Sequence, residues 1–234
     1  MKKYKQIFQD KATLLPVIHC KNIMQTFPNV DMCVQHNTKG VFLINHGISS
    51  KSMGEIYKEI RLIFPKLWIG INFLVLETKD MFFYAKDLGD INGIWADCSE
   101  IDDTKEIQID ADKINKERSD WNGLYFGGVD FKYQLPVNDI TKTTKIAKDF
   151  MDVITTSGVG TGYAPEVDKI KTMKKVAGDI PLAIASGINA DNIHLFWDYA
   201  DCFLVSTGIS KDFHNLDETL LQDLLNKVKL YNEI

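Results

Sequence analysis

The chain of 234 residues is 45% hydrophobic and 25% charged, an ordinary composition for a globular protein and enough sequence to bury a large core. Lys and Arg total 27 against 32 Asp and Glu, and the net charge of −5 argues against nucleic acid or an anionic membrane as a partner. Polar residues at positions 9–11 interrupt the first apolar stretch, so we expect no signal peptide, no transmembrane span and a cytoplasmic location.

Eight short apolar runs divide the chain. Most of them are unbroken rather than alternating, which is typical of strands that are buried on both faces of a parallel sheet. The predicted strands are Leu15–His19, Val41–Asn45, Leu67–Phe73, Gly93–Ala96, Gly123–Phe126, Asp152–Thr155, Leu182–Ala185 and Cys202–Val205.

Helical patterns lie between the runs. We expect a helix start at Ser52, where Glu55 completes a capping box, and another in which Pro165 and Glu166 form the first turn. Asn189 is expected to cap a helix that carries Ile193 and Phe196, and Asn215 precedes an amphipathic closing helix.

Strands that alternate with helices, without hairpin signals, predict an α/β fold: a (β/α)₈ TIM barrel with a closed parallel sheet, as a single domain over residues 1–234. A doubly wound open sheet is the alternative, although it usually needs fewer strands at this length. The weakest unit is the fourth helix, because residues 107–109 have a strand-like pattern.

The four cysteines, Cys20, Cys33, Cys98 and Cys202, include no CxxC pair. We therefore expect small buried thiols of a reducing compartment, all four reduced.

Hydroxyl and glycine residues follow the last strands. Ser186-Gly187 ends strand seven, and Ser206-Thr207-Gly208 ends strand eight at the start of the segment "STGISKDF", which could begin a short helix. In barrels of this class the loops after strands seven and eight commonly bind phosphate, because glycine lets the backbone approach the anion and free N–H groups point at it. The alternative is that the glycines only turn the chain and the hydroxyls cap it.

The loop after strand six, "TTSGVGTGYAP", adds Ser157, Gly158, Thr161 and Gly162 to the predicted phosphate site. Its GxGxG spacing is not a dinucleotide-binding fingerprint. A mobile surface loop without a ligand is the competing interpretation.

Polar residues at the other strand ends are the catalytic candidates, because general acid–base work needs titratable groups around one mouth. They are His19, Asn72, Asp97, Asp130 and Lys132, with Asn45 and His46 less favoured. Asn72 could instead satisfy buried backbone groups, and Asp97 and Lys132 could form a plain ion pair. Asp97 and Asp130 leave Mg²⁺ open, although neither lies in a ligand-spaced motif, so no metal or other cofactor is assigned.

Lys132 stands two residues after Asp130, so both side chains share a face if strand five continues that far. Carboxylate neighbours would keep the amine charged for an electrostatic role. Burial with fewer carboxylates would instead favour a base or a Schiff-base nucleophile.

Several of these segments resemble the BtpA family of TIM barrels. The resemblance is strongest over residues 150–215, in "MDVITTSGVGTG", "IPLAIASGINADNI" and "ADCFLVSTGISKD", and extends to "LPVIHC", "IGINFL" and "VDFKY". It implies a phosphate-binding barrel; some family members carry phosphoribosyltransferase labels, and the founding member is described as a photosystem I biogenesis factor. The chain departs from the family at strand five, where only Lys132 of an Asp-Val-His-x-Lys-His pattern remains, and lacks the proline-rich loop after strand one.

Three functions remain open. The chain could be a lyase, isomerase or synthase acting on a phosphorylated sugar or nucleotide, a phosphoribosyltransferase-like enzyme, or a non-catalytic assembly factor with an inherited phosphate pocket. Polar candidates at several strand ends favour an enzyme. The expected partner is a phosphorylated small molecule, and self-association into a homo-oligomer stays open.

Overall fold

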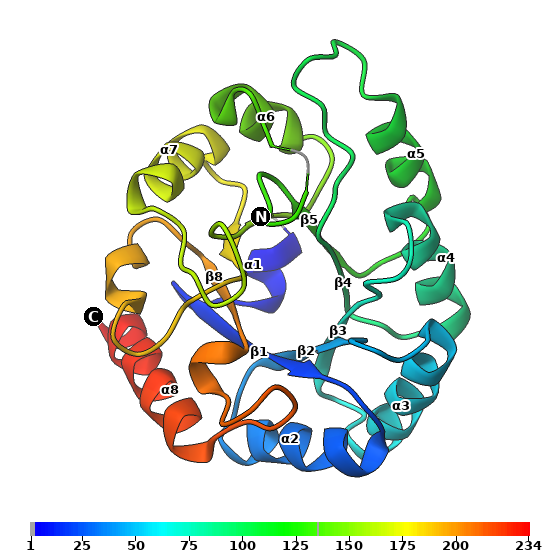
Figure 1. Ribbon diagram of the computed structural model, residues 1–234, viewed down its shortest axis with the longest axis vertical. Coiled ribbons are helices and arrows are strands. Elements are labelled where there is room, and N and C mark those ends of the chain that lie inside the picture. Colours follow the sequence, from blue (N-terminus) through cyan, green and yellow to red (C-terminus); the bar gives the residue numbers. More distant parts are fainter. Residues whose placement is uncertain (1–2, 135) are drawn as a thin grey trace.

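A computed structural model describes residues 3–134 and 136–234. Eight parallel strands follow one another around a closed barrel in chain order, and β8 pairs with β1 to complete the ring (Figure 1). Their bounds are β1 Thr13–His19, β2 Gly40–Ile44, β3 Trp68–Asn72, β4 Gly93–Ala96, β5 Leu124–Gly128, β6 Val153–Thr156, β7 Leu182–Ile184 and β8 Cys202–Val205. The predicted (β/α)₈ barrel is confirmed, and the open sheet is wrong.

The helices form the outer ring of the barrel, except for α1, which lies within the ring in the view of Figure 1. The α-helices are α1 Lys3–Ile7, α2 Ile23–Gln35, α3 Ser50–Ile63, α4 Thr78–Leu88, α5 Ile109–Glu117, α6 Ile140–Ala147, α7 Val167–Ala177 and α8 Glu218–Glu233, with 3₁₀ turns η1 Ile193–Phe196 and η2 Thr207–Ile209. The strand-like segment 107–109 forms no strand and instead leads into α5. None of the helices in the described ranges is long and apolar enough to cross a membrane.

Two predicted helix starts are shifted. Ser49, rather than Ser52, caps α3, and its hydroxyl accepts a hydrogen bond from the N–H of Ser52 at 3.1 Å. Pro165 precedes α7, which begins at Val167, because Glu166 is still extended and takes the N-cap position. In both cases the capping position is decided by backbone geometry that the residue types alone leave open.

The last two predicted helix starts are also corrected. The segment after β7 forms the 3₁₀ turn η1 rather than an α-helix; Asn189 accepts hydrogen bonds from the N–H groups of Asp191 and Asn192 just before it. Helix α8 is capped by Asp217, which accepts from the N–H of Leu220, and not by Asn215. Asn215 lies in the preceding loop, where its backbone N–H and its side-chain amide both donate hydrogen bonds to the carboxylate of Asp212.

Side chains at alternate strand positions fill the barrel lumen and include Leu15, Val17, Phe42, Ile44, Trp68, Trp95, Leu124, Phe126, Val153, Ala183, Leu204 and Cys202. The amino-terminal segment closes one end of this lumen: Tyr4 packs on Phe126 with ring centroids 6.4 Å apart, and Phe8 packs on Trp68 at 5.2 Å. The sequence analysis did not anticipate this plug. It leaves the carboxyl ends of the strands as the open mouth, where barrels of this class carry their sites.

Candidate functional site

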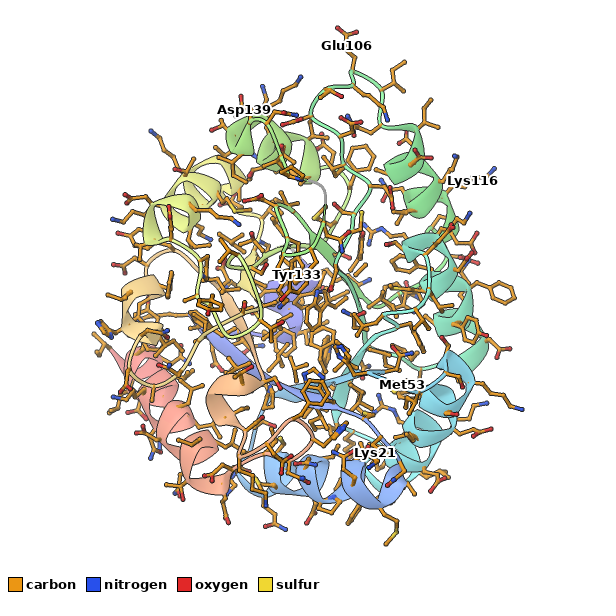
Figure 2. The ribbon with its side chains drawn as sticks, viewed as in Figure 1. Lys21, Met53, Glu106, Lys116, Tyr133 and Asp139 are labelled. Atoms are coloured by element: carbon orange, nitrogen blue, oxygen red, sulfur yellow. The ribbon has the colours of Figure 1, made fainter. Side chains whose placement is uncertain are left out.

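A cavity of about 450 Å³ lies at the carboxyl ends of the strands. Most of the predicted site residues line it, together with residues that the sequence analysis did not select. Figure 2 shows Tyr133, one of the latter, over the centre of the ring. The polar lining residues include His19, Asp97, Lys132, Ser186, Gly187, Ser206 and Thr207, and the apolar ones include Val17, Ile44, Leu74, Trp95 and Phe213.

Glycines hold the loops after β6, β7 and β8 in close contact. A Cβ at Gly187 would collide with the backbone of Ala164 in the loop after β6, and one at Gly208 would collide with the carbonyl of Ile188 in the loop after β7. A Cβ at Gly158 would collide with the carbonyl of Tyr163 in its own loop. Gly187 and Gly208 are thus required by contact between loops and Gly158 by the path of the loop after β6, and Gly187 also adopts a left-handed φ of 63°. This contact, and not only approach to a ligand, explains the glycine pattern in the sequence.

The loops after β7 and β8 present unpaired hydrogen-bond donors to the cavity. Within the described ranges, the backbone N–H groups of Ser186, Gly187, Ile188 and Ser206 donate to no protein acceptor. The hydroxyls of Ser206 and Thr207 also make no hydrogen bond within those ranges. Such a group of free donors beside one cavity is an arrangement that suits an anion.

Other predicted phosphate residues hold the loops instead. The Ser186 hydroxyl donates to the Gly160 carbonyl at 2.8 Å, and the Ser157 hydroxyl accepts from the Lys132 N–H at 2.7 Å. The N–H of Thr161 donates to the Tyr133 hydroxyl at 3.2 Å. Thr161 and Gly162 line the cavity, whereas Ser157 and Gly158 are not among its lining residues.

Asp97 and Lys132 face the same cavity without forming an ion pair in the described part of the chain. Burial raises the pKa of the Asp97 carboxyl, against the opposing effects of Asn72 and the Lys132 charge. The Nδ2 amide of Asn72 donates to Asp97 Oδ1 at 3.0 Å, while its buried Oδ1 has no partner among the residues that the structure describes. Burial lowers the pKa of Lys132, whose ammonium donates to the Ala185 carbonyl at 3.1 Å, and Asp97 only partly opposes this shift.

Asp130 does not join this group. Strand β5 ends at Gly128, and Asp130 has a φ of 46°, so the alternation that would place it beside Lys132 does not hold. Its carboxylate pairs with Lys169 of α7 at 2.7 Å, and it is not among the cavity-lining residues. The expectation of two carboxylates around Lys132 is therefore wrong, as is a Mg²⁺ site between Asp97 and Asp130. The described residues hold no cluster of three His, Cys, Asp or Glu side chains fit for a metal.

His19 and His46 meet at the mouth, with their Nδ1 atoms 3.2 Å apart. Burial lowers the pKa of His19 to about 4, helped by the nearby His46, His214 and Lys132, and also lowers that of His46. Phe213, from the segment after β8, packs its ring 4.4 Å from that of His19.

Trp95, Tyr133 and Phe213 are cavity residues that the sequence analysis missed. Trp95 could have been found, because it stands two residues before Asp97 and strand alternation puts both on one face. Nothing in the sequence near Tyr133 or Phe213 predicts that their loops cross the mouth.

Comparison with known proteins supports this architecture. Residues 126–229 match the model of the BtpA family. The resemblance of the sequence to the BtpA family is confirmed over these residues. An uncharacterized protein of Methanocaldococcus jannaschii is 30% identical over 89 residues, which cover 38% of this chain but only 34% of that relative. The BtpA match therefore includes the β6–β8 loops and Lys132 but not His19, Asn72 or Asp97.

Solved structures share the fold at low sequence identity. A 3-hexulose-6-phosphate synthase from Salmonella typhimurium superposes with a TM-score of 0.69 at 13% identity, over 94% of this chain and 99% of that one. A phosphoribosyl anthranilate isomerase from Thermus thermophilus gives a TM-score of 0.64 at 8% identity, over 93% and 98%. At these identities the likeness supports the (β/α)₈ barrel fold alone.

Proposed function

We propose that the protein is an enzyme that acts on a phosphorylated small molecule, with the phosphate group held by the loops after β7 and β8. The observation that carries this proposal is the set of unpaired N–H and hydroxyl donors at Ser186–Ile188 and at Ser206 and Thr207. They line the same cavity as Asp97 and Lys132. The barrels of similar fold named above as a synthase and an isomerase handle phosphorylated metabolites, which supports the same general class here.

The second part of the proposal concerns the reacting group. Lys132 is half-buried with Asp97 as the one carboxylate that opposes the lowering of its pKa, so the uncharged amine is reached more readily than in a solvent-exposed lysine. Such an amine can remove a proton next to a carbonyl or attack the carbonyl carbon, whose oxygen then leaves as water to form a Schiff base. Asp97, whose pKa is raised, is placed to give or take a proton in the same cavity. A phosphorylated carbonyl compound is therefore the substrate class, and the chemistry is that of a lyase, isomerase or synthase.

The phosphate site is tested by thermal unfolding in increasing inorganic phosphate. Binding to the folded state should raise the midpoint with phosphate concentration. Thr207→Val together with Ser206→Ala should remove most of that rise and leave the midpoint without phosphate nearly unchanged, because neither hydroxyl forms a hydrogen bond within residues 3–134 and 136–234. Thr141→Val, on the exposed start of α6, is the matched control and should keep the full response. An unaltered response in the double variant would place the anion elsewhere.

Lys132 is tested with phosphorylated aldehydes and ketones under borohydride. A Schiff base predicts a covalent adduct that maps to Lys132 and is absent from Lys132→Met. Turnover that is lost in Lys132→Met without any trapped adduct would assign the amine to proton transfer instead. A non-catalytic assembly factor predicts phosphate binding with neither adduct nor turnover, and that result would overturn the enzymatic part of the proposal.

A further inference from the structure

The β1–β4 half of the cavity has a different character from the phosphate loops. Its wall is formed by Val17 of β1, Ile44 of β2, Leu74 after β3 and Trp95 of β4. None of these side chains carries a charge, and Val17, Ile44 and Trp95 are almost fully buried. A polar sugar placed against this wall would lose water contacts without replacement, whereas an apolar group would gain from burial.

Flat rings form the rim above this wall. Phe213 lies 4.4 Å from the ring of His19 and 5.2 Å from that of His46, and the two imidazoles are 5.1 Å apart. Because burial lowers the pKa of both histidines, the rim is uncharged near neutral pH. Aromatic groups of this kind associate best with another planar ring, through stacked or edge-to-face contacts.

We propose that the substrate is a phosphate ester whose organic part includes a flat, uncharged ring, bound against the β1–β4 wall. The inference rests on the proposed function, because the phosphate loops anchor the other end of the same molecule. It separates this cavity from one built for a simple sugar phosphate, whose hydroxyls would find partners at His19, Asp97 and Lys132 but none on the wall itself.

The test compares inorganic phosphate, glycerol 3-phosphate, phenyl phosphate and 1-naphthyl phosphate by calorimetric titration. We expect at least one aromatic ester to bind tenfold or more tightly than inorganic phosphate, and glycerol 3-phosphate to gain little. If phosphate binds but neither aromatic ester binds more tightly, or glycerol 3-phosphate binds best, this inference is wrong and the phosphate site stands. If no phosphate compound binds, the proposed function itself fails.

A wall variant checks the location of the ring. Leu74→Asn changes a half-buried side chain, while the backbone N–H of Leu74 keeps its hydrogen bond to Asn45. It should abolish the preference for the aromatic esters and leave the affinity for inorganic phosphate unchanged. Thr141→Val again serves as the control. An aromatic preference that persists in Leu74→Asn would place the ring away from this wall and overturn the assignment.

Discussion

Acid should destabilise this barrel through His19 as the pH falls from 6.5 toward 4. The imidazole is buried beside His46, His214 and Lys132, so a proton on His19 would meet only like charges among these neighbours. Its pKa is about 4 in the folded protein against 6.5 for the free side chain. Between these values the unfolded chain binds a proton that the folded chain does not, so the free energy of unfolding falls as the pH falls.

The size of the effect follows from the gap between the two pKa values. At about 1.4 kcal/mol for each pH unit, it amounts to about 3 kcal/mol, nearly all of it lost between pH 6.5 and pH 4. His19→Gln removes this contribution. Its lost contacts with His46 and Phe213 lower stability by an amount that does not depend on the protonation of residue 19.

Urea unfolding at half-unit steps from pH 7 to pH 4 measures the effect. The difference in unfolding free energy between the parent protein and His19→Gln should shift by about 3 kcal/mol across this range, with the parent losing more stability. His194→Gln, at an exposed position on η1, serves as the control. A difference that stays constant with pH, or a parent that gains stability relative to the variant on acidification, would refute the reasoning.

Two further predictions test the loops and the thiols. Gly208→Ala should lower the free energy of unfolding by about 1–3 kcal/mol, because its Cβ would collide with the Ile188 carbonyl. The control Gly160→Ala should lower it by well under half as much, because a Cβ there has only contacts of 3.5 Å or more. Equal losses in chemical denaturation would contradict the close contact between the loops. A thiol reagent should label Cys98 first in the folded protein, since Cys20, Cys33 and Cys202 are buried. After unfolding without reductant it should label four thiols, since all four cysteines are free, and fewer than four would reveal a disulfide.

The sequence predicts the barrel well because the same pattern, a short apolar run, occurs at each of the eight strands. Each strand is an unbroken apolar run, and burial on both faces of a parallel sheet demands that pattern wherever a strand occurs. All eight runs become strands, with ends moved by one or two residues at most positions. Helix starts are predicted less well, because Ser49 and Ser52, or Asn215 and Asp217, are equally good caps by residue type and only the backbone decides between them.

The sequence predicts those site residues whose direction is set by the alternation of side chains along a strand. Residues directly at strand ends inherit their direction from the strand, so His19 and Asp97 line the cavity as alternation predicts, while Asn72 reaches it only through its hydrogen bond to Asp97. Asp130 lies beyond the end of β5, where a left-handed turn breaks the alternation, so its partner became Lys169. Rings that arrive from distant loops, such as Phe213, depend on tertiary contacts that no local pattern records.

The close contact among the loops after β6, β7 and β8 limits how the sequence of this barrel can change during evolution. A side chain gained at Gly187 or Gly208 would displace the neighbouring loop as well as its own, so single changes there are rarely neutral. On the β1–β4 side a Cβ at Gly47 would have no atom within 4 Å, and the loops there meet through side-chain contacts such as that of Asn45 with the Leu74 N–H. New specificities are therefore expected to evolve through those loops, while the β6–β8 loops persist as an inherited unit. The distribution of the BtpA resemblance agrees with this expectation, since it is strongest over residues 150–215 and departs from the family after strand one.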